Sequence, residues 1–234
     1  MDGLSVAAAI RAEEQARGAM GIFEAVGKRH SIAMSLLVLG HISWCRGEFK
    51  ESASHYREAH RLFEAFEDRR GMTHCKLRLS ELAFSIRKFK EAQTLIRDAS
   101  EGYRAMGDRV GLVYCKLLHG RVELSAGHLE AALAVFHACT LEMGEIGDVA
   151  GRIQAVAFET AALEKLGRHE EVETNLREIF TTVRGLPVAY ENFAAALDML
   201  SFDLNVRKPE LAIETDALAE EAWQMLGRPV RIIA

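Results

Sequence analysis

The stretch Gly107-Asp108-Arg109-Val110-Gly111 decides the fold, because its pattern recurs 40 residues away in both directions. Each copy places a glycine three positions after an aspartate, at Asp68 and Gly71, Asp108 and Gly111, and Asp148 and Gly151. A fixed period of this length predicts a repeat architecture in which each unit stacks on its neighbours.

Further columns of similar residues keep the same spacing over the rest of the chain. One column has small residues, at Gly40, Ser80, Gly120 and Thr160, and a later column has rings or branched chains, at Tyr56, Ile96, Phe136 and Leu176. Small residues let two helices approach to about 8–10 Å, and the larger side chains fill the space between helix pairs. The columns therefore predict packing between consecutive helix pairs.

Each period divides into two helices of about 16 and 18 residues. We expect an unpaired helix at 7–27, full pairs at 31–67, 71–107, 111–147 and 151–184, a diverged pair at 189–227 and a tail at 228–234. Asp108 and Asp148 suit N-caps, and the column of Gly47, Gly127 and Gly167 suits helix C-termini. Arg87 departs from that glycine column. The prediction is one all-α domain over 1–234, a right-handed superhelical solenoid of about eleven helices.

Composition excludes several other classes of protein. The chain has 234 residues, 49% of them hydrophobic, and a formal net charge of −5, which argues against a general nucleic-acid or membrane surface. No apolar run reaches the roughly 18 residues that cross a bilayer, and the N-terminus has no secretory pattern. Four cysteines in a chain of this size indicate reduced thiols and a cytoplasmic location.

The pattern Gly107–Gly111, Leu39-Gly40, Gly47–Glu51 and the pair of Tyr56 and Ala59 resembles the tetratricopeptide repeat family in its 40-residue variety. That variety occurs in kinesin light chains, spindle-orientation adaptors and sensor domains of bacterial regulators. The resemblance implies a non-catalytic module that holds a peptide or a partner domain in a concave groove lined by the first helix of each pair.

Mapping the concave positions of the family onto this sequence gives a candidate groove. Its members are Met34, Leu37, His41, Trp44, His74, Leu77, Glu81, Phe84, Tyr114, Leu117, Arg121, Leu124 and Gln154. The apolar line of Trp44, Phe84 and Leu124 would suit hydrophobic anchors of a partner, or these rings pack between helices as core. The positions after Leu39-Gly40 and its equivalents carry His41, Glu81 and Arg121 where adaptor repeats commonly have asparagine.

No motif for catalysis, nucleotide binding or a metal site emerges, so no cofactor and no metal are expected. His41 and Cys45 supply only two possible zinc ligands. The sequence thus predicts a scaffold that binds a protein or peptide, with no enzymatic activity. The alternative is a ligand- or signalling-peptide-sensing domain of a multidomain bacterial regulator. The apolar ends, the helix at 7–27 and the tail, suggest either a segment of a longer protein or a homodimer formed end to end; a tail folded over the last helix is the third possibility.

Overall fold

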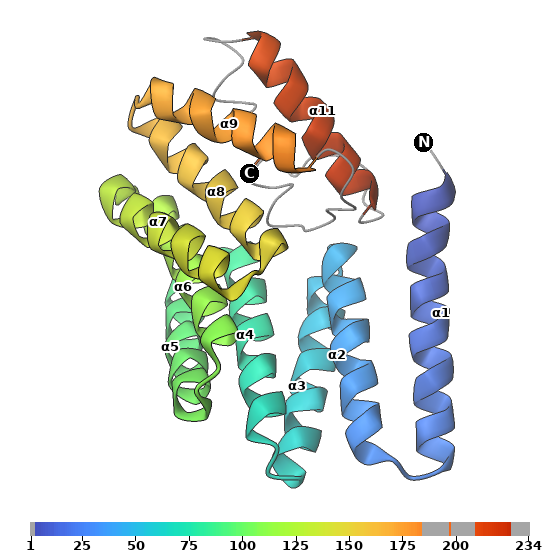
Figure 1. The fold of residues 1–234 in the computed structure, drawn as a ribbon. Helices are drawn as coiled ribbons and strands as arrows, with labels where there is room; N and C mark the ends of the chain where they lie inside the picture. Colours follow the sequence, from blue (N-terminus) through green and yellow to red (C-terminus); the bar gives the residue numbers. More distant parts are fainter. Residues whose placement is uncertain (1–2, 184–196, 198–208, 226–234) are drawn as a thin grey trace. The chain divides into compact units, whose positions relative to one another are not determined.

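The computed structural model describes residues 3–183, 197 and 209–225 (Figure 1). Every regular element in these residues is an α-helix, which confirms the all-α prediction. The helices are α1 Gly3–Ala25, α2 Arg29–Cys45, α3 Phe49–Ala65, α4 Arg69–Ser85, α5 Phe89–Met106, α6 Arg109–Ser125, α7 Leu129–Ile146, α8 Val149–Lys165, α9 His169–Val183 and α11 Pro209–Met225.

The chain forms two compact units, Met1–Cys115 and Lys116–Ala234, and the boundary falls within α6. In the first unit α1 packs on α2, α2 on α3, α3 on α4, and α4 on α5; in the second unit α7 packs on α8 and α8 on α9. Within each unit these neighbours in sequence are therefore neighbours in space, and they run antiparallel (Figure 1). Helices α2 to α9 correspond to the four pairs expected between 31 and 184, and the division of the chain into these repeats stays a prediction. The first helix expected in 189–227 lies outside the described residues apart from Leu197, and the single domain over 1–234 stays a prediction.

Eight turns between consecutive helices share one backbone conformation. The residue at each turn has a positive φ between 55° and 83°, at Gly27, Gly47, Glu67, Arg87, Gly107, Gly127, Gly147 and Gly167. The amide of the following residue bonds back across the turn, as from Asp68 to the carbonyl of Phe63 at 2.9 Å. This is the Schellman ending, which glycine adopts without a steric penalty. Arg87 and Glu67 adopt the same left-handed conformation, although neither is a glycine.

We expect Glu67→Gly to raise the free energy of unfolding by about 0.5–1 kcal/mol, because the left-handed conformation penalises a Cβ atom. Urea unfolding followed by circular dichroism measures this. Glu58→Gly, at an exposed position in the body of α3, is the control, and should lower the free energy of unfolding by about 1 kcal/mol. A loss of stability in Glu67→Gly would contradict the assigned turn.

The aspartate of each Asp-x-x-Gly motif caps the helix that follows. The Asp68 carboxylate accepts a hydrogen bond from the amide of Gly71 at 3.0 Å, Asp108 does so from Gly111 at 3.0 Å, and Asp148 from Gly151 at 2.8 Å. The predicted N-caps at Asp108 and Asp148 are confirmed. Each cap satisfies one amide that has no partner within its helix.

At the small-residue positions, large side chains of the neighbouring helix pack directly against the backbone. A Cβ atom built on Gly71 would lie 2.4 Å from the ring of Phe63, one on Gly111 2.3 Å from Tyr103, and one on Gly151 2.0 Å from Met143. In the other column a Cβ atom on Gly40 would lie 2.6 Å from Tyr56, and one on Gly120 2.7 Å from Phe136. These distances are too short for any real Cβ contact. Five glycines thus set how closely consecutive helices approach.

Gly111→Ala is expected to lower the free energy of unfolding by about 1–3 kcal/mol, because the methyl group displaces the buried ring of Tyr103. Gly144→Ala is the matched control, since the nearest atom to its Cβ is Arg152 Cδ at 3.6 Å. Chemical denaturation of both variants measures the difference. Equal stabilities of the two variants would show that the Gly111 contact does not limit packing.

Apolar side chains near the end of α1 and just after it are exposed to solvent. Ile22 is 65% exposed and Val26 is 61% exposed. The tail at 228–234 lies outside the described residues, so pairing through the two ends stays a prediction. No helix in the described parts of the chain is long and apolar enough to cross a membrane.

Candidate partner-binding face

One side of α4 carries a continuous stripe of polar side chains. His74, Arg78, Glu81 and Ser85 are spaced by four, three and four residues, which brings them to the same side of the helix. Glu81 is 6% exposed, whereas 31% of the Arg78 side chain remains accessible. The stripe therefore combines a buried carboxylate with a guanidinium that reaches the surface. We call it the α4 stripe.

Arg78 connects the members of the α4 stripe. Its Nη1 donates to Glu81 Oε2 at 2.8 Å, and its Nε donates to His74 Nε2 at 3.4 Å. The neighbouring Glu81 carboxylate raises the pKa of Arg78, so the guanidinium stays charged. Nη2 has no hydrogen-bond partner among the described residues. A buried carboxylate without a cation would be costly, so Arg78 both stabilises Glu81 and presents free donors.

Two neighbouring helices fix the ends of the α4 stripe. Trp44 of α2 donates its indole Nε1–H to Ser85 Oγ at 3.3 Å, and Ser85 in turn donates to the Glu81 carbonyl at 3.0 Å. The Tyr103 hydroxyl of α5 lies 3.4 Å from His74 Nδ1. The side chains are thus held by contacts from helices on both sides of α4.

His74 is kept neutral by its surroundings. Burial lowers the pKa of His74 to about 4, and the positive charges of Arg78 and His41 act in the same direction, against Glu81 and Asp108. At neutral pH the ring therefore accepts a hydrogen bond at Nε2 from Arg78. The Tyr103 hydroxyl can then face a protonated Nδ1.

The depressed pKa of His74 predicts a loss of stability on acidification. The unfolded chain takes up the proton near pH 6.5 and the folded chain only near pH 4. The contribution of His74 to the free energy of unfolding should therefore fall by about 1–3 kcal/mol as the pH drops from 6.5 to 4. Below pH 4 this contribution should stay constant.

His74→Gln should remove that part of the pH dependence. Urea titrations of the unmodified chain and of His74→Gln at several pH values between 4 and 7 separate the contribution of His74 from that of the carboxylates, which titrate in both proteins. Identical pH profiles would contradict the buried neutral ring.

In the second unit, the position equivalent to Glu81 is Arg121 of α6, and its guanidinium meets an aromatic ring. The Arg121 guanidinium lies 5.1 Å from the ring centroid of Phe158, and Phe158 stacks on Phe136 at 5.5 Å. Gln154 is 3% exposed, and its Oε1 has no hydrogen-bond partner among the described residues. Arg121 of α6 and Gln154 of α8 are therefore largely enclosed in this unit.

The residues predicted for the groove divide into three groups by exposure. Met34, which is 50% exposed, and His41 reach the solvent. Leu37, His74, Phe84 and Tyr114 are half-buried, and the buried ones are Trp44, Leu77, Glu81, Leu117, Arg121, Leu124 and Gln154. Trp44 packs with Ala53 and Leu82, as the core alternative proposed. Phe84 meets Phe89 edge to face at 5.6 Å.

Two accessible positions were missed by the sequence mapping. Val38, which is 49% exposed, follows the half-buried Leu37, and Arg78 follows the buried Leu77. The four-residue steps from Met34 to Val38 and from His74 to Arg78 keep these side chains on one side of their helices. That spacing was available in the sequence. The binding role of every groove residue stays a prediction.

The described residues contain no group of three or more His, Cys, Asp or Glu side chains that could hold a metal ion. His41 Nε2 and Cys45 Sγ do approach each other, at 3.7 Å. Two such groups are fewer than a structural zinc site uses.

Comparison with known proteins shows the class of fold, which is tetratricopeptide-like, as the sequence pattern predicted. BtubC (BKLC) from P. vanneervenii matches with a TM-score of 0.61 and 13% identity, over 99% of this chain and 96% of that one. A Rap protein complexed with competence and sporulation factor matches with a TM-score of 0.74 and 15% identity, over 92% of this chain and 60% of that one.

Aspartyl phosphate phosphatase F from Bacillus subtilis matches with a TM-score of 0.62 and 14% identity, over 88% of this chain and 63% of that one. The chain thus spans less than two thirds of the length of these last two proteins. No protein-family model and no curated protein matches the sequence.

Proposed function

We propose that the chain is a non-catalytic scaffold that binds a peptide or a partner domain on the side formed by the first helices of its pairs. We call this side the first-helix face. Within the first unit it comprises Met34, Val38, His41 and Cys45 of α2 with the α4 stripe. The binding of partners by proteins that share this fold supports the proposal only in general terms.

The observation that carries the proposal is the composition of the first-helix face. Met34 and Val38 of α2 are exposed, and Arg78 of α4 presents free donors on a side chain that Glu81 and His74 already hold. Apolar contacts with a preorganised guanidinium are typical of residues that dominate binding energy, since little side-chain entropy is lost. Arg78 would donate to a backbone carbonyl or a carboxylate of the partner.

The alternative is a sensor domain of a larger bacterial regulator, which binds a small ligand or a signalling peptide. It is favoured by the Rap complex with competence and sporulation factor, of which this fold covers 60%. The two functions differ in what occupies the same face.

An enzymatic role fits the chemistry poorly. Burial raises the pKa of the Cys75 and Cys139 thiols to about 12 and that of Cys115 to about 11. These thiols stay protonated at neutral pH and are unsuited to act as nucleophiles. His74 is engaged with Arg78 and Tyr103. We therefore propose no reaction, no cofactor and no metal.

The double variant Met34→Asp/Val38→Asp tests the proposal. Affinity capture on the immobilised chain from a lysate of the source organism, followed by mass spectrometry, should identify a partner. Its capture should fall at least about ten-fold in the double variant, because two charges replace apolar contacts at the centre of the face.

Leu141→Asp on α7 is the control, since Leu141 is 58% exposed and lies on a second helix of a pair. It should capture the partner as the unmodified chain does. Circular dichroism checks that all three proteins are equally helical. Unchanged capture by the double variant would move the binding site away from this face.

A further inference from the structure

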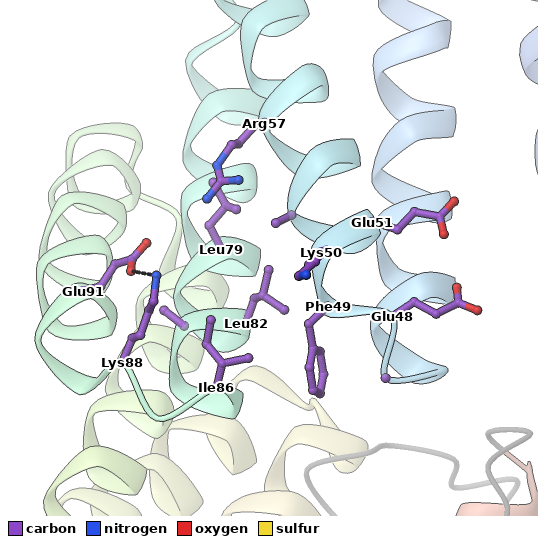
Figure 2. A pocket seen from close by; sticks show the side chains of 13 residues that line it. Glu48, Phe49, Lys50, Glu51, Arg57, Leu79, Leu82, Ile86, Lys88 and Glu91 are labelled. Atoms are coloured by element: carbon purple, nitrogen blue, oxygen red, sulfur yellow. Dashed lines mark ion pairs between the residues drawn. The ribbon is translucent and has the colours of Figure 1, made fainter.

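A cleft of about 760 Å³ lies on another side of the first unit (Figure 2). Its floor is apolar and comes from Leu79, Leu82 and Ala83 of α4 and from Ile86 just after that helix, with Ala53 and Phe49 of α3 beside them. These α4 residues lie on a different side of the helix from the α4 stripe. Ile86 is 40% exposed, so this floor meets the solvent. We call the cleft the α3–α5 groove.

The next repeat along the chain does not keep this apolar floor. Forty residues further on, the equivalents of Leu79, Ala83 and Ile86 are His119, Glu123 and Ala126. His119 and Glu123 are polar and approach each other at 3.8 Å. The repeat architecture therefore does not require a continuous apolar surface here, and packing of the fold does not explain it.

Two cations stand on the α3 wall without partners. Lys50 and Arg57 are exposed and make no hydrogen bond or ion pair among the described residues, although both line the cleft. Two of the three acids that line the cleft are engaged in ion pairs. Glu91 pairs with Lys88 at 3.1 Å across the opposite wall, and Glu51 pairs with Arg17 of α1 at 3.4 Å.

Figure 2 shows the Glu48 and Glu51 side chains directed away from Leu79 and Leu82. Arg57 by contrast reaches toward Leu79 in the same view. The wall that borders the floor is therefore positive.

The spacing of the cations indicates what kind of ligand they fit. Lys50 and Arg57 are seven residues apart, which is about 10.5 Å along α3, and Leu79 of α4 and Ile86 just after α4 are also seven residues apart. A ligand that uses both cations needs two acidic groups at that separation beside an apolar surface. A fatty acid has a single carboxylate and would leave one cation unused.

We propose that the α3–α5 groove is a second docking site, which takes an amphipathic helix of a partner protein. Aliphatic side chains of that helix pack on Leu79, Leu82 and Ile86, and two acidic residues seven positions apart pair with Lys50 and Arg57. The site is independent of the first-helix face, so a partner can occupy each.

The test uses the whole chain and a synthetic probe. The probe is a fluorescein-labelled helical peptide of about 14 residues, with leucines on one side and two glutamates seven positions apart beside them. Fluorescence anisotropy should show binding at least about ten-fold tighter than that of a shuffled peptide of the same composition, and weaker binding at high salt.

Lys50→Glu/Arg57→Glu should weaken binding of the probe by at least about ten-fold, because attraction becomes repulsion at both ends. Lys90→Glu, an exposed change on α5 outside the cleft, should leave binding unchanged. Methyl NMR spectra should show shifts at Leu79, Leu82 and Ile86 on addition of the probe. All three substituted residues are exposed, so the fold should be retained.

Three results would overturn the proposal. The first is no binding of the probe, or binding that Lys50→Glu/Arg57→Glu does not change. The second is binding of dodecanoate at the same methyl groups without binding of the peptide, which would assign the cleft to an amphiphile. The third is a dimer in sedimentation experiments that the charge reversal dissociates, which would assign the cleft to a second copy of the chain.

Discussion

The close approach of a ring to a bare backbone is the constraint on which the rest of the structure depends. Phe63 on Gly71 and Tyr103 on Gly111 leave no space for a Cβ atom, and the aspartate three residues earlier fixes where the glycine stands by capping its amide. One short motif therefore sets both the start of a helix and its distance from the preceding helix. Repetition of that motif every 40 residues produces the sequential packing of pairs.

The sequence was informative about the fold because most of its signals are local. Asp108 and Gly111 lie three residues apart, and the turn at Gly127 needs only its own backbone conformation, so both are visible without a tertiary context. Arg87 and Glu67 depart from the glycine pattern in sequence, but their turns have the same conformation, because the hydrogen bonds across each turn form without glycine. The rings on Gly40 and Gly120 were predicted as columns, but their contact distances depend on tertiary packing.

The candidate site was less predictable, because exposure depends on helix rotation. A helix advances by about 100° per residue, so an error of one position moves a side chain from the surface into the core. Leu77 was expected in the groove and is buried, whereas Arg78 beside it reaches the solvent. The pairing of Arg78 with Glu81 was equally hidden, since it depends on which rotamers the neighbouring helices permit. The α3–α5 groove needs three helices to form and has no signature in the sequence.

The ring currents of the buried aromatic side chains test the central constraint most directly. In NMR spectra of the whole chain, the Hα protons of Gly40, Gly71, Gly111 and Gly120 should be shifted strongly upfield. They should also show nuclear Overhauser contacts to the rings of Tyr56, Phe63, Tyr103 and Phe136 respectively. Random-coil shifts for these protons, or contacts from these rings to helices distant in sequence, would contradict the account.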